Sequence, residues 1–387
     1  MFQTLKSVVF IGIILSFSAC SSNHDIDCHT YYSKKAATQN AHTNRYTKLS
    51  IDTLAIHRDI ESSFIGFWVT HNKQLVFVDY LYGYLFTFDA KGNLQGRHVG
   101  RGSGPDEMQR ADYAIPFNKG YYLMNAGNST LAFFNKNWQK EHHFHIDWDI
   151  RQSVQEVLRK PDPQKTSPYE FDYGIPEIVQ QWDKNHVAIA ITASHPKFNG
   201  YFNSELYYKH SRILALVDVS THKITSLIGR RPPFYLKNQN IPNFDHFNYK
   251  VEKNEFFVDF WADSLIYRID KNNGQLLKAF GKAGKNMRTD YRKTYSYEEA
   301  EDNRQADQAT YDYYHYLTSI PEEQILFRGY TLNQKDFEGL QVYEDDTLAG
   351  EFQVPKGFKL LGKIANNLIA INEYDEDALI LYKVTIQ

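Results

Sequence analysis

The chain has 387 residues, of which 42% are hydrophobic and 23% are charged, and this composition is typical of a globular protein with one large or two medium domains. The formal charge of -3 is close to neutral, which argues against a general nucleic-acid-binding protein. The aromatic share of 15%, with 28 Tyr and 26 Phe, favours β-strands.

Residues 1–19 have the features of a secretory signal peptide. Lys6 precedes an apolar run at residues 8–17, which is too short to cross a bilayer core of about 30 Å as a helix. The run ends in "FSAC", where small residues stand directly before Cys20. This ending resembles the lipobox of bacterial lipoproteins, although Phe17 replaces the usual leucine. The resemblance implies cleavage before Cys20 and lipidation of its thiol; a plain secretory signal with a chance cysteine is the alternative.

A lipid on Cys20 would attach the protein to the membrane, and we expect a cell-envelope lipoprotein of the outer membrane that faces the periplasm or the exterior. Several acyl chains on one residue hold a protein stably on a bilayer. Cys28 then has no disulfide partner, because the chain contains two cysteines. The polar segment 20–45 is predicted to be a flexible tether.

From residue 46 onward, short apolar runs with an alternating pattern are separated by Gly, Asn, Asp and Lys, as in a sandwich, a barrel or a propeller. Three segments align with one another: "FVDYLYGYLFTFD", "LMNAGNSTLAFFN" and "FVDFWADSLIYRID". In each, one strand is closed by Asp79, Asn125 or Asp259, whose side chains suit turns. Weaker copies bring the number of units to about six, each about 40 to 65 residues long, as expected for propeller blades.

The last unit lacks an outer strand, and residues 46–54 are expected to supply it and close the ring. We therefore predict an all-β fold at residues 46–387, a six-bladed β-propeller of four-stranded antiparallel blades, with seven blades as the alternative. Insertions near residues 152–172 and 286–309 interrupt the repeats. The second is predicted to contain a helix at 297–309 and to form a lid over the channel mouth.

The run "FVDYLYGYLFTFDAKGNL" followed by "GRGSGPDEM" resembles the six-bladed β-propeller lipoproteins of the Bacteroidetes, which are related to NHL-like and TolB-like propellers and include many proteins of unknown function. In that group a Gly-x-Gly-x-Gly-Pro-x-Glu run follows the outer strand of a blade. The matching residues are Gly100, Gly102, Gly104, Pro105 and Glu107. Met108 stands where an aromatic residue is usual. The resemblance implies the fold but little about activity, because propellers carry many unrelated functions.

The glycine-rich stretch at residues 99–108 fits a turn between blades, because glycine permits positive φ and Pro105 sets a turn position. A phosphate-binding loop would need Gly-Lys-Ser/Thr and a following helix, and both are missing from the sequence. Similar junctions occur at "IGRRPPF" and "FGKAGKN". If the blades are in register, the cations of these junctions form a basic rim around the channel that attracts an anionic ligand. The candidate ligand-binding residues are Arg101, Arg230, Arg231 and Lys282, with Lys285 as a further member.

Other constellations are weaker. The alternative to ligand binding is that water solvates the rim cations, or that they pair with local carboxylates such as Asp106 and Glu107. His143 and His145 share one face of a strand, but no third ligand can be assigned, so we predict no metal site and no cofactor. The tyrosine-rich runs at 169–173 and 311–316 are expected to pack between blades rather than to stack on sugars.

No catalytic constellation is recognisable in the sequence, so no catalytic residue is assigned. The preferred function is a membrane-anchored binding module or scaffold that takes a protein, peptide or glycan on one propeller face. The alternative is a propeller lyase or hydrolase acting on an anionic polysaccharide, which would need His, Arg, Tyr and carboxylate side chains that converge in the channel with perturbed pKa values. A structural subunit of an envelope complex is a third reading, which a large exposed apolar patch would favour.

Overall fold

The computed structural model of the chain describes residues 27–32, 43–57, 59–71, 74–174, 177–202, 204–374 and 380–387. The predicted signal peptide and Cys20 lie outside the described residues. In the part of the chain that is described, no helix is long and apolar enough to cross a membrane.

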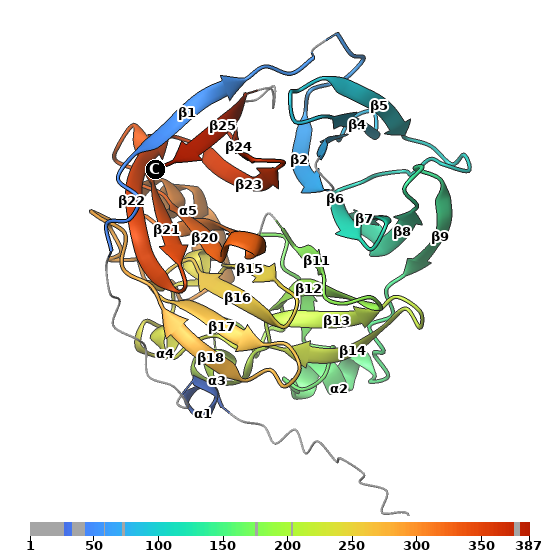
Figure 1. Cartoon of the computed structure of the whole chain (residues 1–387). Coiled ribbons are helices and arrows are strands. Elements are labelled where there is room, and N and C mark those ends of the chain that lie inside the picture. Colours follow the sequence, from blue (N-terminus) through green and yellow to red (C-terminus); the bar gives the residue numbers. More distant parts are fainter. Residues whose placement is uncertain are drawn as a thin grey trace, which may run out of the picture.

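Six antiparallel sheets surround a central axis as the blades of a propeller (Figure 1). The first blade has β2 (Gly66–His71), β3 (Gln74–Asp79), β4 (Tyr84–Phe88) and β5 (Leu94–Val99), and the second has β6 (Tyr113–Phe117), β7 (Gly120–Asn125), β8 (Thr130–Phe134) and β9 (Lys140–His145). The third has β10 (Tyr169–Phe171), β11 (Val179–Gln181), β12 (His186–Ala193), β13 (Leu214–Asp218) and β14 (Lys223–Ile228). The fourth has β15 (Phe247–Val251), β16 (Glu255–Phe260), β17 (Ile266–Asp270) and β18 (Leu276–Phe280). The fifth has β19 (Tyr314–Ile320), β20 (Ile325–Tyr330), β21 (Phe337–Glu344) and β22 (Thr347–Pro355), and the sixth has β23 (Phe358–Ile364), β24 (Asn367–Asn372), β25 (Leu381–Ile386) and β1 (Leu49–Leu54).

The first strand of each blade lines the axis. Strand β23 packs against β2 and β19, β15 packs against β19 and β11, and β11 packs against β6. In the third blade, β10 and β11 both pair with β12 and so share the innermost position. The prediction of six four-stranded antiparallel blades is confirmed, and the seven-bladed alternative is excluded.

The ring closes through the sixth blade. Strand β1 pairs antiparallel with β25, from Leu49 opposite Ile386 to Leu54 opposite Leu381. The N-terminal strand therefore supplies the outer strand of the last blade, as predicted, and the two ends of the domain are hydrogen-bonded to each other.

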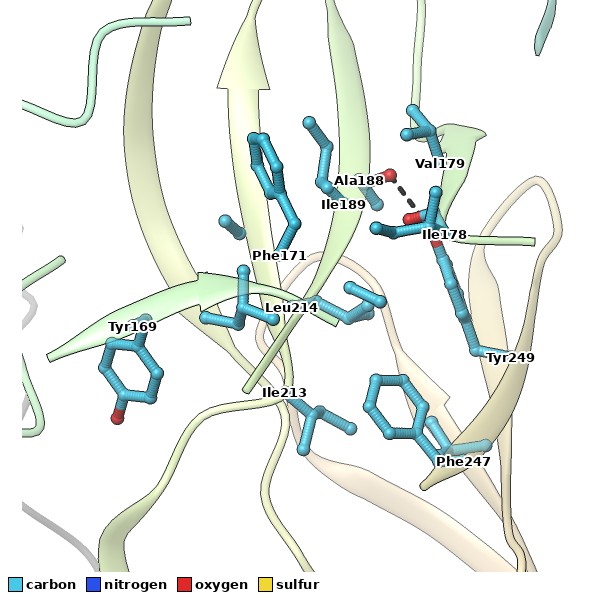
Figure 2. Packing of buried hydrophobic residues seen from close by; sticks show 14 of the residues in the cluster. Tyr169, Phe171, Ile178, Val179, Ala188, Ile189, Ile213, Leu214, Phe247 and Tyr249 are labelled. Carbon is cyan, nitrogen blue, oxygen red and sulfur yellow. Dashed lines mark hydrogen bonds between the residues drawn. The ribbon is translucent and has the colours of Figure 1, made fainter. Parts of the chain in front are cut away.

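The hydrophobic core lies between neighbouring blades, where alternate strand residues meet. Figure 2 shows the contact between the third blade, with Leu214, and the fourth, with Phe247 and Tyr249; all three side chains are buried. The Tyr249 hydroxyl donates hydrogen bonds of 3.0 Å to the carbonyls of Ile178 and Ala188. The aromatic residues thus serve two purposes, because their rings fill the space between blades and their hydroxyl groups satisfy buried carbonyls.

A short helix, α1 (Cys28–Tyr32), docks against the outside of the propeller (Figure 1). Cys28 is fully buried, and the ring of Tyr32 packs edge-on against Tyr267 of β17 with centroids 4.8 Å apart. The Tyr32 hydroxyl donates to the carbonyl of Arg230 at 2.5 Å. The prediction of a flexible tether over residues 20–45 is therefore wrong for these five residues. The polar composition of this segment gave no sign that the side chains of Cys28 and Tyr32 are buried.

The two ends of the propeller differ in their connections. The innermost strands begin at one end, which also carries the links between blades and the hairpins between the second and third strands; we call it the crossover end. The opposite end, the hairpin end, carries the other hairpins, and those described have two to five residues between strands. Among the described residues, the remaining α-helices all belong to crossover-end connections: α2 (Val154–Arg159), α3 (Ser204–His210), α4 (Phe234–Lys237) and α5 (Tyr297–Thr310).

Candidate functional site

The glycine-rich stretch is a turn that is folded on itself at the crossover end. The Met108 amide donates to the carbonyl of Gly100 at 3.0 Å, and the Glu107 carboxylate accepts from the amide of Gly104 at 2.8 Å. A Cβ atom on Gly102 would lie 1.9 Å from that carboxylate, so a larger residue does not fit without a shift. Lys140 of the next blade donates to the carbonyl of Glu107 at 2.7 Å. The stretch therefore acts as a tie between the first two blades.

The four cations predicted to form a basic rim do not share one surface. Arg101 and Lys282 are exposed at the crossover end, whereas Arg230 is 1% exposed and Arg231 is 0% exposed. The two buried arginines cannot reach a ligand on the surface, so the predicted four-cation rim is not present as such. Arg101 and Lys282 remain candidates.

The buried arginines hold the insertions of the crossover end together. Arg231 Nε donates to Asp245 Oδ1 at 2.5 Å and its Nη1 donates to Ser211 Oγ at 3.1 Å. Arg230 Nη1 donates to the carbonyl of His210 at 3.1 Å. The desolvation cost of a buried guanidinium is offset by such partners, which sequence alone does not reveal. The double arginine is therefore a structural element.

Five pairs of an acid and a base, which we call the mouth ring, surround the axis at the crossover end. Each pair has a member that lies just before or on an innermost strand. The pairs are Arg110–Asp112, His246–Asp172 at 3.1 Å, Lys250–Glu177, His315–Glu338 at 3.4 Å and Lys359–Glu373 at 2.8 Å. Because each carboxyl group has a basic partner, the mouth carries little net charge, in contrast to the predicted basic rim.

Glu338 and His315 form the most deeply buried pair of the ring. A β-bulge at His315, between the pairs Tyr314–Tyr330 and Tyr316–Gly329, redirects this side chain. Burial raises the pKa of Glu338 to about 7 and lowers the pKa of His315 to about 4. Both shifts favour the neutral form of the group, because the surroundings solvate charge poorly.

Glu373, in the neighbouring sixth blade, has a pKa shift in the opposite direction. Burial opposes its ionisation, but the ammonium group of Lys359 outweighs burial and lowers the pKa of the carboxyl. For Lys359, burial is likewise outweighed by the carboxylates of Glu373 and Glu177, which raise its pKa. Glu177 belongs to the third blade and Lys359 to the sixth, so groups on opposite sides of the mouth influence each other. The mouth thus combines a carboxyl whose pKa is close to neutral pH with one whose pKa is lowered.

Exposed apolar side chains are confined to the crossover end. All thirteen exposed large hydrophobic residues among those described lie in its connections. Six form what we call the mouth patch: Ile65, Tyr80, Leu81, Tyr82, Tyr173 and Tyr374. Seven form what we call the insert patch: Ile150, Val154, Leu158, Phe202, Leu206, Tyr295 and Tyr297. The exposed large hydrophobic residues are therefore gathered at one end of the propeller, and such gathering is a common feature of interaction surfaces.

The mouth patch and the mouth ring are joined directly. Tyr374 is 56% exposed, and its hydroxyl donates to Glu338 Oε1 at 3.3 Å. Burial raises the pKa of Tyr113 to about 12, and the adjacent Tyr80 and Asp112 add to this shift. In the two tyrosine-rich runs, Tyr169, Tyr314 and Tyr316 are buried as predicted, but Tyr173 is exposed at the mouth.

The remaining predicted features contribute less. The insertion at 286–309 lies at the crossover end, and its helix α5 packs on the 3-10 turn η2 (Pro242–Phe244). None of its described residues belongs to the mouth ring, and its role as a lid stays a prediction. In the described part of the chain, no three His, Cys, Asp or Glu side chains come close enough to hold a metal ion. His145 instead contacts the hydroxyl of Thr130 at 2.9 Å.

One cavity lies away from the mouth, with a volume of about 390 Å³. It is bounded by β14 and by the chain on either side of α2, and its lining includes Asp149, Arg151 and Lys165. It opens to solvent at the outer edge of the third blade, so it is separate from the mouth ring.

Sequence reasoning missed His315, Glu338, Lys359 and Glu373. His315 stands inside a tyrosine-rich run, and Glu338 and Lys359 are second residues of strands that read as ordinary alternation. A usable signal is their common position, since each lies within two residues of the crossover end of a strand. These four side chains come from the fifth and sixth blades, so they meet only when the blades pack side by side.

Comparisons with known proteins give the fold alone. No family model and no curated protein matches the chain. A member of the DUF4221 family from Bacteroides vulgatus superimposes with a TM-score of 0.66 at 10% identity, over 89% of this chain and 99% of that one. A Bacteroides fragilis protein, named as a candidate exported protein, gives 0.52 at 14% identity, over 90% and 98%. Both likenesses extend over about nine tenths of this chain.

Proposed function

We propose that the chain is a lipid-anchored binding module of the cell envelope that takes a protein, peptide or glycan ligand at the crossover end. The observation that carries this proposal is that, among the described residues, every exposed large hydrophobic side chain lies at that end. Tyrosine rings offer both apolar area and a hydrogen-bonding hydroxyl at low entropic cost, and are favoured at binding surfaces. The likeness to a candidate exported protein agrees with a location in the envelope.

The mouth patch and the mouth ring form the centre of the proposed ligand site. Long connections at one end of a rigid scaffold are common carriers of function. The near-neutral ring favours a ligand with mixed polar groups over a polyanion. Arg101 and Lys282 remain available at the same end for a ligand that also carries a carboxylate or phosphate.

A thermal-shift screen tests this proposal. The chain from residue 21 would be mixed with neutral oligosaccharides, acidic oligosaccharides and short peptides, because a ligand that binds the native state raises the midpoint of unfolding. We expect a shift that is lost in Tyr80→Ala/Tyr374→Ala. The control Lys119→Ala/Lys136→Ala, at the hairpin end, should keep the shift. A shift lost in the control but kept in the tyrosine variant would place the site at the wrong end.

A second candidate function, the polysaccharide lyase or hydrolase, is favoured by the opposite pKa shifts of Glu338 and Glu373. A protonated carboxyl can donate to a leaving oxygen and an ionised one can accept a proton, which is how acid and base roles are divided in many active sites. Tyr374 covers Glu338 and would have to move aside.

Product release from polygalacturonate and alginate tests the enzyme candidate. Reducing ends report hydrolysis, and the ultraviolet absorbance of an unsaturated product reports elimination. Activity that falls above pH 7 and is lost in both Glu338→Gln and Glu373→Gln would support it. Activity that survives in both variants would remove the mouth ring from the reaction.

A further inference from the structure

The insert patch contains a helix whose apolar face has no cover. In α2, Val154 is 74% exposed and Leu158 is 49% exposed, and their spacing places both on one side of the helix. None of the six residues of α2 is buried. A capping box between Ser153 and Glu156 holds the helix in place. A fixed helix that presents two of its three branched apolar residues to water, with Val157 half-buried, lacks much of the packing that usually stabilises so short a helix.

The patch continues across three insertions. The carbonyl of Val157 lies 2.9 Å from Nε2 of His195, which joins α2 to the segment before α3. That segment ends in Phe202, which is 69% exposed. The ring of Tyr201 lies 6.2 Å from the ring of Tyr297, which begins α5. The exposed apolar residues of α2, α3 and α5 therefore lie on connected structure beside the third and fourth blades.

Cations flank the patch at α2, and the carboxylates of Glu156 and Glu205 are engaged, whereas the exposed Glu298 lies beside Tyr297 at the α5 edge of the patch. Arg159, Lys160 and Lys197 are exposed, and none of the three has an ion pair with another described residue. Glu156 accepts from the amide of Ser153 at 2.8 Å, and Glu205 pairs with Lys209 at 2.6 Å. Apolar side chains beside lysine and arginine are typical of segments that lie in the headgroup region of a membrane.

The start of the described chain lies next to this patch. Helix α1 contacts α3, and Figure 1 shows both on the same side of the ring. From Asp27 back to the predicted lipid-bearing Cys20 the chain has seven residues, which span at most about 25 Å when fully extended. An anchor at Cys20 therefore lies within about 25 Å of Asp27, on the side of the ring that carries α3 and Phe202.

We propose that the insert patch lies on the surface of the membrane that carries the anchor, with Val154, Leu158 and Phe202 in the headgroup region and the adjacent cations toward anionic lipids. This inference goes beyond ligand binding but rests on the lipidation of Cys20 in the proposed function. The contact is at the edge of the crossover end, beside the third and fourth blades. It fixes the propeller in orientation and leaves the mouth patch, which includes residues of the first and sixth blades, for the ligand.

Vesicle flotation of the chain from residue 21, which has no acyl group and keeps every described residue, tests the patch separately from the anchor. The vesicles would be phosphatidylcholine with and without phosphatidylglycerol. We expect flotation that increases with phosphatidylglycerol and falls about tenfold in partition coefficient in Val154→Ser/Leu158→Ser/Phe202→Ser, because about three apolar side chains leave the interface. Arg159→Gln/Lys160→Gln should remove the dependence on phosphatidylglycerol.

The matched control is Leu81→Ser/Tyr82→Ser in the mouth patch, which should float as the unchanged chain does. No flotation of the unchanged chain, or an equal loss in the control, would overturn the proposal. The proposal would also be overturned if the unchanged chain formed a dimer and the insert-patch variant were a monomer. A second copy of the chain, and not the membrane, would then cover the patch. Incorporation of labelled palmitate in cells, compared with Cys20→Ala, tests the anchor, so its failure would count against the proposed function and not against the flotation result.

Discussion

The crossover end and the hairpin end are built from the same strands but differ in nearly every surface property. At the hairpin end, short turns are closed by side chains such as Asp270, which accepts from the amides of Asn272 and Asn273. At the crossover end, long connections carry the helices, the buried ion pairs and all the exposed large hydrophobic side chains of the described residues. The contrast teaches that short-range turn chemistry holds one end, while the other end carries buried charge and exposed apolar surface, both of which cost stability unless something compensates for them.

The largest expected effect is at Arg328, which ties the fourth and fifth blades near the crossover end. It is 0% exposed, lies 3.1 Å from Asp259 Oδ1 and donates to the carbonyl of Lys282 at 2.7 Å. Arg328→Met should lower the free energy of unfolding by about 3–5 kcal/mol, because it leaves Asp259 buried and unpaired. Urea unfolding measures this.

The matched control is Arg268→Met, at an ion pair near the hairpin end. Arg268 has a side chain that is 36% exposed and pairs with Glu255 and Asp346. Its loss should cost no more than about 1 kcal/mol, since Asp346 keeps Lys278 as a partner at 3.2 Å. Equal costs for the two arginines would contradict the contrast between the ends.

The next effect is a pH dependence at Glu338. Its pKa in the folded state is about 7, above that of an unfolded glutamate, so the stability it contributes is present at acid pH and is lost as the pH rises through about 7. Glu338→Gln removes this loss. Relative to the unchanged chain, the variant should gain about 2–3 kcal/mol between pH 5 and pH 8, measured by urea unfolding at several pH values.

Glu373→Gln should act in the opposite direction. The pKa of this carboxyl is lowered by Lys359 against the effect of burial, so its contribution is present at neutral pH and is lost on acidification. The variant should be less stable than the unchanged chain at pH 7, and the difference should shrink in acid. Parallel pH curves for the two variants would show that the two carboxyls do not differ in environment.

A smaller effect is expected at α1. Tyr32→Phe removes the hydrogen bond to the carbonyl of Arg230 and should cost about 1 kcal/mol in thermal or urea unfolding. Tyr31→Phe is the control, because the buried Tyr31 hydroxyl has no hydrogen-bond partner among the described residues. A loss in the control and none in Tyr32→Phe would mean that α1 docks differently.

The smallest effect is expected at the exposed members of the predicted basic rim. Arg101→Ala/Lys282→Ala should change the free energy of unfolding by less than about 0.5 kcal/mol, because both side chains are exposed. Arg231→Met should cost about 3–5 kcal/mol, because Asp245 would be left buried without its partner. Equal changes in the free energy of unfolding for the two variants would indicate that Arg231 does not stabilise the fold, contrary to what its burial implies.

The repeat pattern predicted the blades because each contains local information. Alternating residues, Asp79 in its turn, and the glycine-rich junction all act within a few residues of chain, whereas Asp259, predicted to close a turn, instead pairs with Arg328 of the next blade. The closure by β1 was predictable for a related reason, since the last repeat is one strand short. The helix of the 286–309 insertion was also visible in its composition and became α5.

The repeat pattern did not show which charged residues are exposed and which are buried. Arg101 and Arg231 stand in similar junctions, yet one is exposed and the other is buried against Asp245, because the insertions that cover Arg231 are distant in the sequence. Cys28 and Tyr32 read as part of a polar tether for the same reason, since their burial depends on α3 and β17. Burial is a property of what packs on a residue, and the local pattern does not contain it.

By itself, the sequence determined the strand repeat, the number of blades and the means of closing the ring, because strand alternation and turn chemistry act over short distances. The tertiary structure alone decided which end carries the apolar surface and which acids and bases meet at the mouth. Glu338 and Glu373 are similar side chains in the sequence, and they diverge in pKa because one is buried beside neutral His315 while the other faces the ammonium group of Lys359.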